Sequence, residues 1–196
     1  MGGSILPATI YNNKIYLLFG KERDIDDNPG WSDFGGGTEK GESFLDTASR
    51  EGSEEMTGLL GNKTDIRHLL TKHGTFDVDF KNNGHSTYRA HIFPMKYDDR
   101  LPYYYNNNQR FLQHHLDANI IKDTKIFEKT QIKWFCIDDL KKHRKQFRSF
   151  YQNIIDLIIA DKVPINTFIR KSLHGQKGKK SRKNKNKRKK NTRKRR

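Results

Sequence analysis

The sequence predicts an α/β protein in which helices pack around a mixed β-sheet. Some segments alternate apolar and polar residues or are rich in aromatic and β-branched residues, which is typical of strands. Others have apolar residues three and four positions apart, which is typical of helices. The two kinds of segment mix without a regular strand–helix–strand repeat, which indicates α/β layers around a mixed sheet. A chain of 196 residues has room for one domain with a core of its own.

The first part of the chain begins with a predicted hairpin. Residues 5–11 and 14–20 are apolar segments, and Tyr11-Asn12-Asn13-Lys14 between them has the composition of a tight turn. Residues 21–31 then form a polar loop that contains a Pro-Gly turn. A glycine-rich loop follows and leads into a helix that we expect over Ser43–Leu60.

The second part of the chain continues with both kinds of element. Residues 76–80 and 86–97 are predicted strands, as is the segment 131–137, whereas residues 65–74 fit either a helix or a strand. Tyr103–Asp117 is expected to be a partly helical insertion. A closing amphipathic helix is indicated by five apolar side chains spaced along one face: Phe147, Phe150, Ile154, Leu157 and Ile158.

Positive charge is concentrated at the C-terminal end. The formal net charge is +16, and 14 Lys and Arg residues lie in residues 176–196, so the rest of the chain carries +2. The same 21 residues include no acidic and no apolar residue, so they have nothing to bury and should be disordered. We therefore expect a folded domain over residues 1–165, a linker over residues 166–175 and a disordered polybasic tail over residues 176–196.

Three features bear on the compartment. A single cysteine, Cys136, excludes an internal disulfide and suits a reducing environment. The N-terminal residues lack the charged region and apolar core of a signal peptide. The longest apolar run, Ile154–Ala160, is far shorter than the ~20 residues of a membrane span. We expect an intracellular protein of the cytoplasm or nucleus, without membrane association.

The most informative stretch is the predicted helix and the glycines before it. On a helix over Ser43–Leu60, one narrow stripe faces the core and contains Leu45, Ala48, Gly52, Met56 and Leu59. A glycine in a helix interior costs roughly 1 kcal/mol relative to alanine. We therefore expect this helix to approach another element very closely at Gly52.

Three glutamates lie on the arc beside this stripe. Glu51, Glu54 and Glu55 are neighbours on the helix surface, where like charges repel. A hard divalent cation such as Mg²⁺, which prefers oxygen ligands, would neutralise them; a solvated acidic face is the alternative. Gly35–Gly37 allows close approach of the main chain to a ligand and frees a carbonyl oxygen as a further metal ligand, with an ordinary turn as the alternative. Glu42 and Arg50 can pair and fix the glycine loop against the helix.

The spacing of these residues resembles the Nudix box of Nudix hydrolases. Gly36 is followed after five residues by Glu42, after seven more by Arg50-Glu51, and after two more by Glu54-Glu55. Six such positions coincide by chance about once in 10⁷ starting points.

Two flanking segments extend the resemblance to about Ser4–Lys162. Trp31–Gly36 is similar to the family's tryptophan followed by Pro-Gly-Gly, with Phe34 in place of proline, and Trp134–Leu140 is similar to its later strand and turn. Two positions depart from the family. Gly52 replaces a large aliphatic residue, and two residues, rather than one, separate the paired glutamates from the next glycine.

The resemblance implies a Nudix-type α/β/α sandwich and Mg²⁺- or Mn²⁺-dependent hydrolysis of a nucleoside diphosphate linked to another group. It implies Glu54 and Glu55, together with Glu51, as metal ligands, with the Gly35 carbonyl as a further one. Orientation of the attacking water is the alternative role for Glu51.

Further site residues are weaker candidates. Glu128 stands six residues before Trp134, where the family often has a glutamate that adds a ligand or serves as base; a surface glutamate is the alternative. Arg23 could hold a substrate phosphate, or be a surface arginine. Trp31 and Tyr103–Tyr105 could stack on a base, or be buried aromatics.

The substrate is not distinguished by the Nudix box, since members of the family act on nucleotides, dinucleoside polyphosphates, diphosphoinositol phosphates and capped RNA. The tail would bind RNA by counterion release, which favours hydrolysis of the 5′ cap of mRNA. Some Nudix hydrolases of large DNA viruses decap mRNA, and this Lys-, Asn-, Ile- and Tyr-rich chain resembles them. One alternative is a nucleotide or diphosphoinositol polyphosphate pyrophosphatase whose tail is a nuclear targeting signal. The other is a catalytically inactive RNA-binding protein, against which the intact glutamates count.

Overall fold

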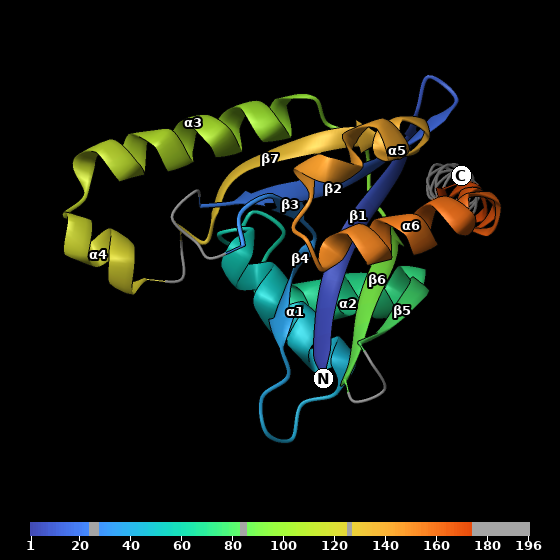
Figure 1. Cartoon of the computed structure of the whole chain (residues 1–196), viewed down its shortest axis with the longest axis horizontal. Helices are drawn as coiled ribbons and strands as arrows, with labels where there is room; N and C mark the ends of the chain where they lie inside the picture. The colour runs from blue at the N-terminus through green and yellow to red at the C-terminus, as the bar shows by residue number, and fades with distance from the viewer. Residues whose placement is uncertain (24–27, 83–85, 125–126, 174–196) are drawn as a thin grey trace, which may run out of the picture.

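Among the residues that the structure describes, a mixed seven-stranded sheet lies at the centre (Figure 1). This computed structural model describes residues 1–23, 28–82, 86–124 and 127–173, so the predicted tail and the end of the predicted linker lie outside the described residues. The strands are β1 (Gly2–Tyr11), β2 (Lys14–Glu22), β3 (Trp31–Ser32), β4 (Phe34–Gly37), β5 (Phe76–Asn82), β6 (Ser86–Pro94) and β7 (Lys129–Cys136).

The sheet has the order β3-β2-β1-β6-β5, with β4 also paired to β1 and β7 to β2. The pair β1–β6 is parallel and the other pairs are antiparallel, which confirms the predicted mixed sheet. The first hairpin is also confirmed, because Tyr11 pairs with Lys14 across the turn. Asn12 and Asn13 have φ values of 46° and 62°, in the left-handed region that asparagine tolerates and that a two-residue hairpin turn requires.

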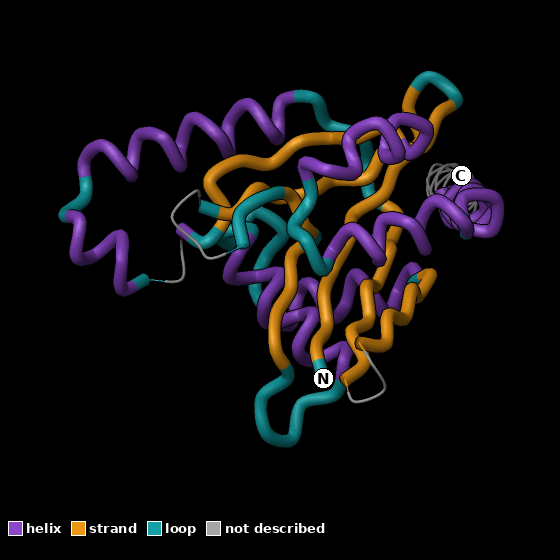
Figure 2. The backbone as a smooth tube through the Cα atoms, viewed as in Figure 1, coloured by secondary structure: helices purple, strands orange, loops and turns teal. Residues whose placement is uncertain are grey.

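Helices cover both faces of the sheet (Figure 2). They are α1 (Phe44–Glu55), α2 (Lys63–His73), α3 (Arg100–His115), α4 (Ala118–Asp123), α5 (Leu140–His143) and α6 (Tyr151–Ala160). One core cluster lies between the sheet and α5 and α6, and the other lies between the sheet and α1, α2 and α3. The helix α2 covers most of the segment 65–74, for which the sequence fitted either a helix or a strand. Among the described residues, no helix is long and apolar enough to cross a membrane.

The helix α1 begins where the sequence predicts and ends earlier. Ser43 is the N-cap residue and forms a capping box with Asp46. At the other end, Thr57 and Gly58 have positive φ values of 49° and 73°, which stop the helix after Glu55. The prediction of a helix to Leu60 was wrong, and Leu59, expected on the core stripe, is 50% exposed.

The close approach expected at Gly52 is confirmed. A Cβ atom on Gly52 would lie 2.8 Å from Cγ1 of Ile5 on β1. Ile5 is fully buried, so β1 and α1 meet at the position where α1 lacks a side chain. This contact fixes how α1 lies on the sheet.

The end of the described chain differs from the prediction in two ways. The helix α6 begins at Tyr151, so Phe147 packs in the core ahead of it, and Phe150 is 37% exposed. Residues 162–173 are helical, including most of the segment 166–175 that was expected to be a linker. Ile165 and Ile169, four positions apart on this helix, are buried in the core, and this burial orders the segment.

Candidate active site

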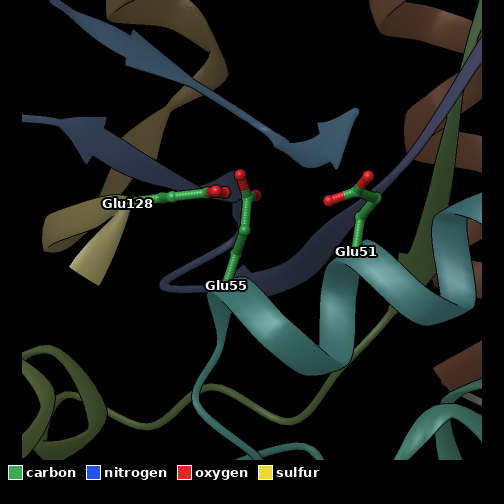
Figure 3. A group of neighbouring side chains, drawn as sticks. All are labelled: Glu51, Glu55 and Glu128. Atoms are coloured by element: carbon green, nitrogen blue, oxygen red, sulfur yellow. The ribbon is translucent and has the colours of Figure 1, made fainter. Parts of the chain in front are cut away.

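Three carboxylates converge beside Gly35–Gly37, which belong to the strand β4 and not to the loop that the sequence predicts. Glu51 and Glu55 lie one turn apart on α1, and Glu128 stands immediately before β7. One oxygen from each side chain lies within 4.8 Å of the others (Figure 3). Glu51 and Glu55 are 7% and 3% exposed. The arrangement is thus an oxygen-rich group with two buried members and one half-buried member, drawn from parts of the chain that are far apart in the sequence.

Glu54 is not part of this group. Its side chain is 34% exposed, and its Oε2 lies 3.7 Å from Nη1 of Arg50. Successive residues of a helix point about 100° apart, so Glu54 and Glu55 cannot point the same way. Glu128 lies near Glu55. The structure therefore brings together Glu51, Glu55 and Glu128 rather than the three glutamates of the helix.

The carboxylates border a pocket of about 320 Å³. It is lined by Glu22, Arg23, Gly35, Gly36, Glu51, Glu55, Glu128 and Arg148. A Cβ atom on Gly36 would lie 2.7 Å from Cδ of Glu51, so the missing side chain is what lets this carboxylate lie against β4. Trp31 is not among the lining residues. Its ring packs edge to face against Phe135, with 5.1 Å between the centroids.

A buried lysine, Lys129, lies next to the carboxylates. Lys129 is 1% exposed and forms ion pairs with Glu22 and with Glu55, whose Oε1 is 3.4 Å from Nζ. It also donates a hydrogen bond of 2.8 Å to Ser32. Burial alone would lower the pKa of Lys129, but the carboxylates of Glu55 and Glu22 outweigh burial and raise it, so the ammonium stays charged.

The charged form of Glu55 is disfavoured at this position. Burial raises its pKa well above the ordinary value, Lys129 opposes this shift, and the carboxylates of Glu22, Glu128 and Glu51 add to it. Its Oε2 is buried and has no hydrogen-bond partner among the described residues. The set of hard oxygen donors, with one buried oxygen unsatisfied, therefore fits a divalent cation.

The comparison with known families decides the assignment. A family model of the NUDIX domain matches residues 6–157. This chain belongs to the Nudix family. The family and the acidic pocket together identify it as a hydrolase, as the spacing of the glutamates predicts.

Several solved structures resemble this chain at low sequence identity, including one with a TM-score above 0.5. The bifunctional NMN adenylyltransferase/ADP ribose pyrophosphatase of Francisella tularensis is 15% identical with a TM-score of 0.51, over 80% of this chain and 40% of that one. The Ap4A hydrolase of C. elegans is 14% identical with a TM-score of 0.44, over 91% and 99% of the two chains. The NUDIX domain of Shewanella oneidensis NrtR, complexed with ADP ribose, is 12% identical with a TM-score of 0.43, over 80% and 83%. No curated protein sequence matches the chain.

Arg50 connects α1 to Glu42 and to the end of β4. Its Nε and Nη2 donate to Glu42 at 3.0 and 3.1 Å, and Nη2 also donates to the Gly37 carbonyl at 3.1 Å. Its Nη1 lies 2.7 Å from Oε1 of Glu51. One guanidinium thus connects Gly37 at the end of β4, Glu42 just before α1 and one carboxylate of the site. The contact with Glu42 is the pairing that the sequence suggests for Glu42 and Arg50.

Sequence reasoning missed several residues of this Nudix site. Lys129 and Glu22 are 107 positions apart, and local patterns do not reveal such a pair. The burial of Glu22 could have been predicted, because it is four residues from the buried Leu18 on β2 and so lies on the same face of the sheet. Tyr105 was considered only for stacking, yet it is 1% exposed and its hydroxyl donates to the Glu55 carbonyl at 2.8 Å and to the Lys129 carbonyl at 3.2 Å. Tyr105 thereby ties the end of α1 to the start of β7.

Proposed function

We propose that this Nudix hydrolase is a divalent-metal-dependent pyrophosphohydrolase that cleaves the diphosphate bond of a nucleoside-diphosphate-linked substrate. The observation that carries the proposal is the convergence of Glu51, Glu55 and Glu128 within 4.8 Å in one pocket. These carboxylates would hold Mg²⁺ or Mn²⁺, with the Gly35 carbonyl beside them. The bound ion would neutralise phosphate oxygens and activate water.

Each residue at the site has a proposed role. Glu51 and Glu55 serve as ligands, and Glu128 serves as a further ligand or as the base that takes a proton from water. Glu54 is not among the residues that line the pocket, and we assign it no role as a ligand. Arg23 and Arg148 line the same pocket, and their guanidinium groups suit the non-reacting phosphate oxygens.

A second pocket supports the proposal that the substrate contains a nucleoside. It has a volume of about 260 Å³ and shares Gly35, Gly36 and Arg148 with the first. Tyr88 and Phe150 line it, and the Phe150 ring is partly exposed, with the Arg148 guanidinium 5.1 Å from its centroid. A planar base would share this ring with the cation. The stacking role considered for Trp31 therefore passes to Phe150, because Trp31 lines neither pocket.

A substrate panel tests the proposal. The purified chain is assayed with Mg²⁺ and with Mn²⁺ on nucleotide sugars, dinucleoside polyphosphates, capped RNA and inositol pyrophosphates. Glu55→Gln should lower kcat at least about 100-fold, because it removes a ligand charge. Glu39→Gln is the matched control, since Glu39 is 65% exposed and lies 3.8 Å from Nε of Arg50. Wild-type activity in Glu55→Gln would refute the proposal, and inactivity on every substrate would favour an inactive binding protein.

A capped RNA is the substrate we favour within this class, because of one sequence feature. The 14 cations of residues 176–196 would raise the local concentration of RNA at the pocket. Deleting these residues should reduce cap hydrolysis and its salt dependence while leaving the turnover of small nucleotides unchanged. Equal cap hydrolysis with and without the tail would favour the alternative, in which the tail is a targeting signal of a small-molecule pyrophosphatase.

A further inference from the structure

The outward side of α3 has a composition that the hydrolase reaction does not explain. We propose that it binds a single-stranded polynucleotide by stacking bases on exposed aromatic rings. The surface, called the α3 face below, consists chiefly of Arg100, Tyr103, Tyr104, Arg110, Phe111 and His115, all of which are exposed. The proposal goes beyond hydrolysis and does not depend on it.

The aromatic residues of the α3 face are unusually exposed. Tyr103, Tyr104 and Phe111 are 65%, 61% and 59% exposed. Large rings exposed together on one surface mark an interaction site. The rings occur in two groups: Tyr103 packs on Tyr104 with 5.3 Å between centroids, and Phe111 lies 4.4 Å from the ring of His115. Tyr104 and Phe111 are seven residues apart, which places them on the same side of α3 and roughly 10 Å apart.

The inward side of α3 accounts for how this helix is held, so the exposed rings have no packing role. Asn106 donates to the Ile132 carbonyl at 3.2 Å and accepts from the Ile132 amide at 2.8 Å, which satisfies the outer edge of β7. Tyr105 and Gln109 are buried beneath the helix. Removing the outward rings should therefore leave the docking of α3 intact.

The charge of the α3 face favours a polyanion. No acidic residue occurs from Arg100 to His115, and the acids that flank the helix are Asp98 and Asp99 before it and Asp117 after it. The exposed residues of α3 include two arginines but no Leu, Ile, Val or Met, so the exposed rings stand among cations and amides. Rings interleaved with cations and amides are the combination that binds single strands, because every base has a face that can stack. A duplex would keep its bases stacked and unavailable.

The α3 face belongs to the same body as the active-site pocket. α3 leads into α4, where the Ile121 carbonyl accepts a hydrogen bond of 3.4 Å from Arg23, a residue that lines the pocket. On its inward side, Tyr105 holds the first residue of β7. Figure 1 shows α3 and α4 extending together along the side of the molecule where β7 begins.

Fluorescence anisotropy of a labelled 12-nucleotide single strand, without added divalent cations, tests the proposal on the full chain. Tyr104→Ala/Phe111→Ala should raise Kd about tenfold or more, since a stacked base is a large contribution. The slope of log Kd against log salt should not change, because no charge is removed. Leu59→Ala/Val163→Ala, which truncates side chains that are 50% and 73% exposed elsewhere, is the control and should keep Kd within about twofold.

Two further variants separate stacking from charge and from misfolding. Arg100→Gln/Arg110→Gln should reduce the salt slope by about 1.4, because each lost phosphate contact contributes about 0.7 for a single strand. Tyr104→Trp/Phe111→Trp retains two rings and should bind at least as tightly as the wild type. RNA and DNA strands of one sequence, compared side by side, identify which polymer is preferred.

Three results would overturn the proposal. The first is an unchanged Kd in a folded Tyr104→Ala/Phe111→Ala chain. The second is an equal rise in Kd for a duplex and for a single strand in the Tyr104→Ala/Phe111→Ala chain, because the tail is the same in both chains and stacking requires unpaired bases. The third is loss of self-association or of a protein partner in that variant with no loss of polynucleotide binding. Because no hydrolysis is measured, none of these results depends on whether the proposed enzymatic function is right.

Discussion

Lys129 places its ammonium nitrogen 3.4 Å from Oε1 of Glu55, and both side chains are buried. The same ammonium forms an ion pair with Glu22. The active site thus contains a fixed positive charge that belongs to the protein and partly neutralises its carboxylates. Two consequences follow: the chain should be stable without a metal, and its stability should depend on this lysine.

Replacing Lys129 with methionine should destabilise the metal-free chain by about 3–5 kcal/mol, because the buried Glu55 loses its cation and Glu22 keeps only its ion pair with Arg148. Mg²⁺ should restore part of the loss, since binding to the native state stabilises it. Urea unfolding with a chelator and with Mg²⁺ measures both effects. Lys133→Met, on the exposed side of the same strand, is the control and should cost far less. A Lys129→Met chain as stable as the wild type in chelator would show that this ion pair does not stabilise the fold.

The pair of Glu42 and Arg50 should make stability depend on acid pH. Hydrogen bonds from Arg50 hold the pKa of Glu42 at about 2, against an ordinary value of 4.5. Because the folded-state pKa is lowered, this contribution is complete above about pH 4.5 and is lost as the pH falls towards 2. Glu42→Gln should lose about 1.5–3 kcal/mol at pH 7, and its deficit relative to wild type should shrink between pH 4.5 and 2. A deficit that is constant with pH, measured by urea unfolding across this range, would argue against the pair as its cause.

The contact between Gly52 and Ile5 predicts a compensating pair of substitutions. Gly52→Leu restores the aliphatic residue of the family at this position, but it should destabilise this chain by about 1–3 kcal/mol through overpacking against Ile5. Ile5→Ala alone should cost about 2–5 kcal/mol through the cavity it leaves. The double variant should lose less than the sum of the two, as measured by chemical unfolding. Additive losses would mean that the two side chains do not compete for one space.

The parts of the site that the sequence predicts are those set by local geometry. The start of α1 follows from the cap at Ser43, and the arc of Glu51 and Glu55 follows from helical periodicity. The end of α1 was not predictable in the same way, because it depends on the left-handed backbone at Thr57 and Gly58.

Long-range contacts set the rest of the site. Glu128 joins the carboxylates because β7 pairs with β2, and Lys129 meets Glu22 for the same reason. Residue spacing alone therefore favoured Glu54, because acidic residues lie next to it in the sequence. The acidic neighbours of Glu128 are close to it only in the folded structure. Only the resemblance to the Nudix family pointed to Glu128.

Direct measurement of Mn²⁺ binding is the sharpest test of the proposal that Glu51, Glu55 and Glu128 hold the metal. Titration followed by electron paramagnetic resonance gives Kd for the wild type, Glu55→Gln, Glu128→Gln and the matched variant Glu54→Gln. We predict that Glu55→Gln and Glu128→Gln raise Kd about tenfold or more, whereas Glu54→Gln raises it less than about threefold. Weaker Mn²⁺ binding in Glu54→Gln than in Glu128→Gln would contradict this assignment of the site.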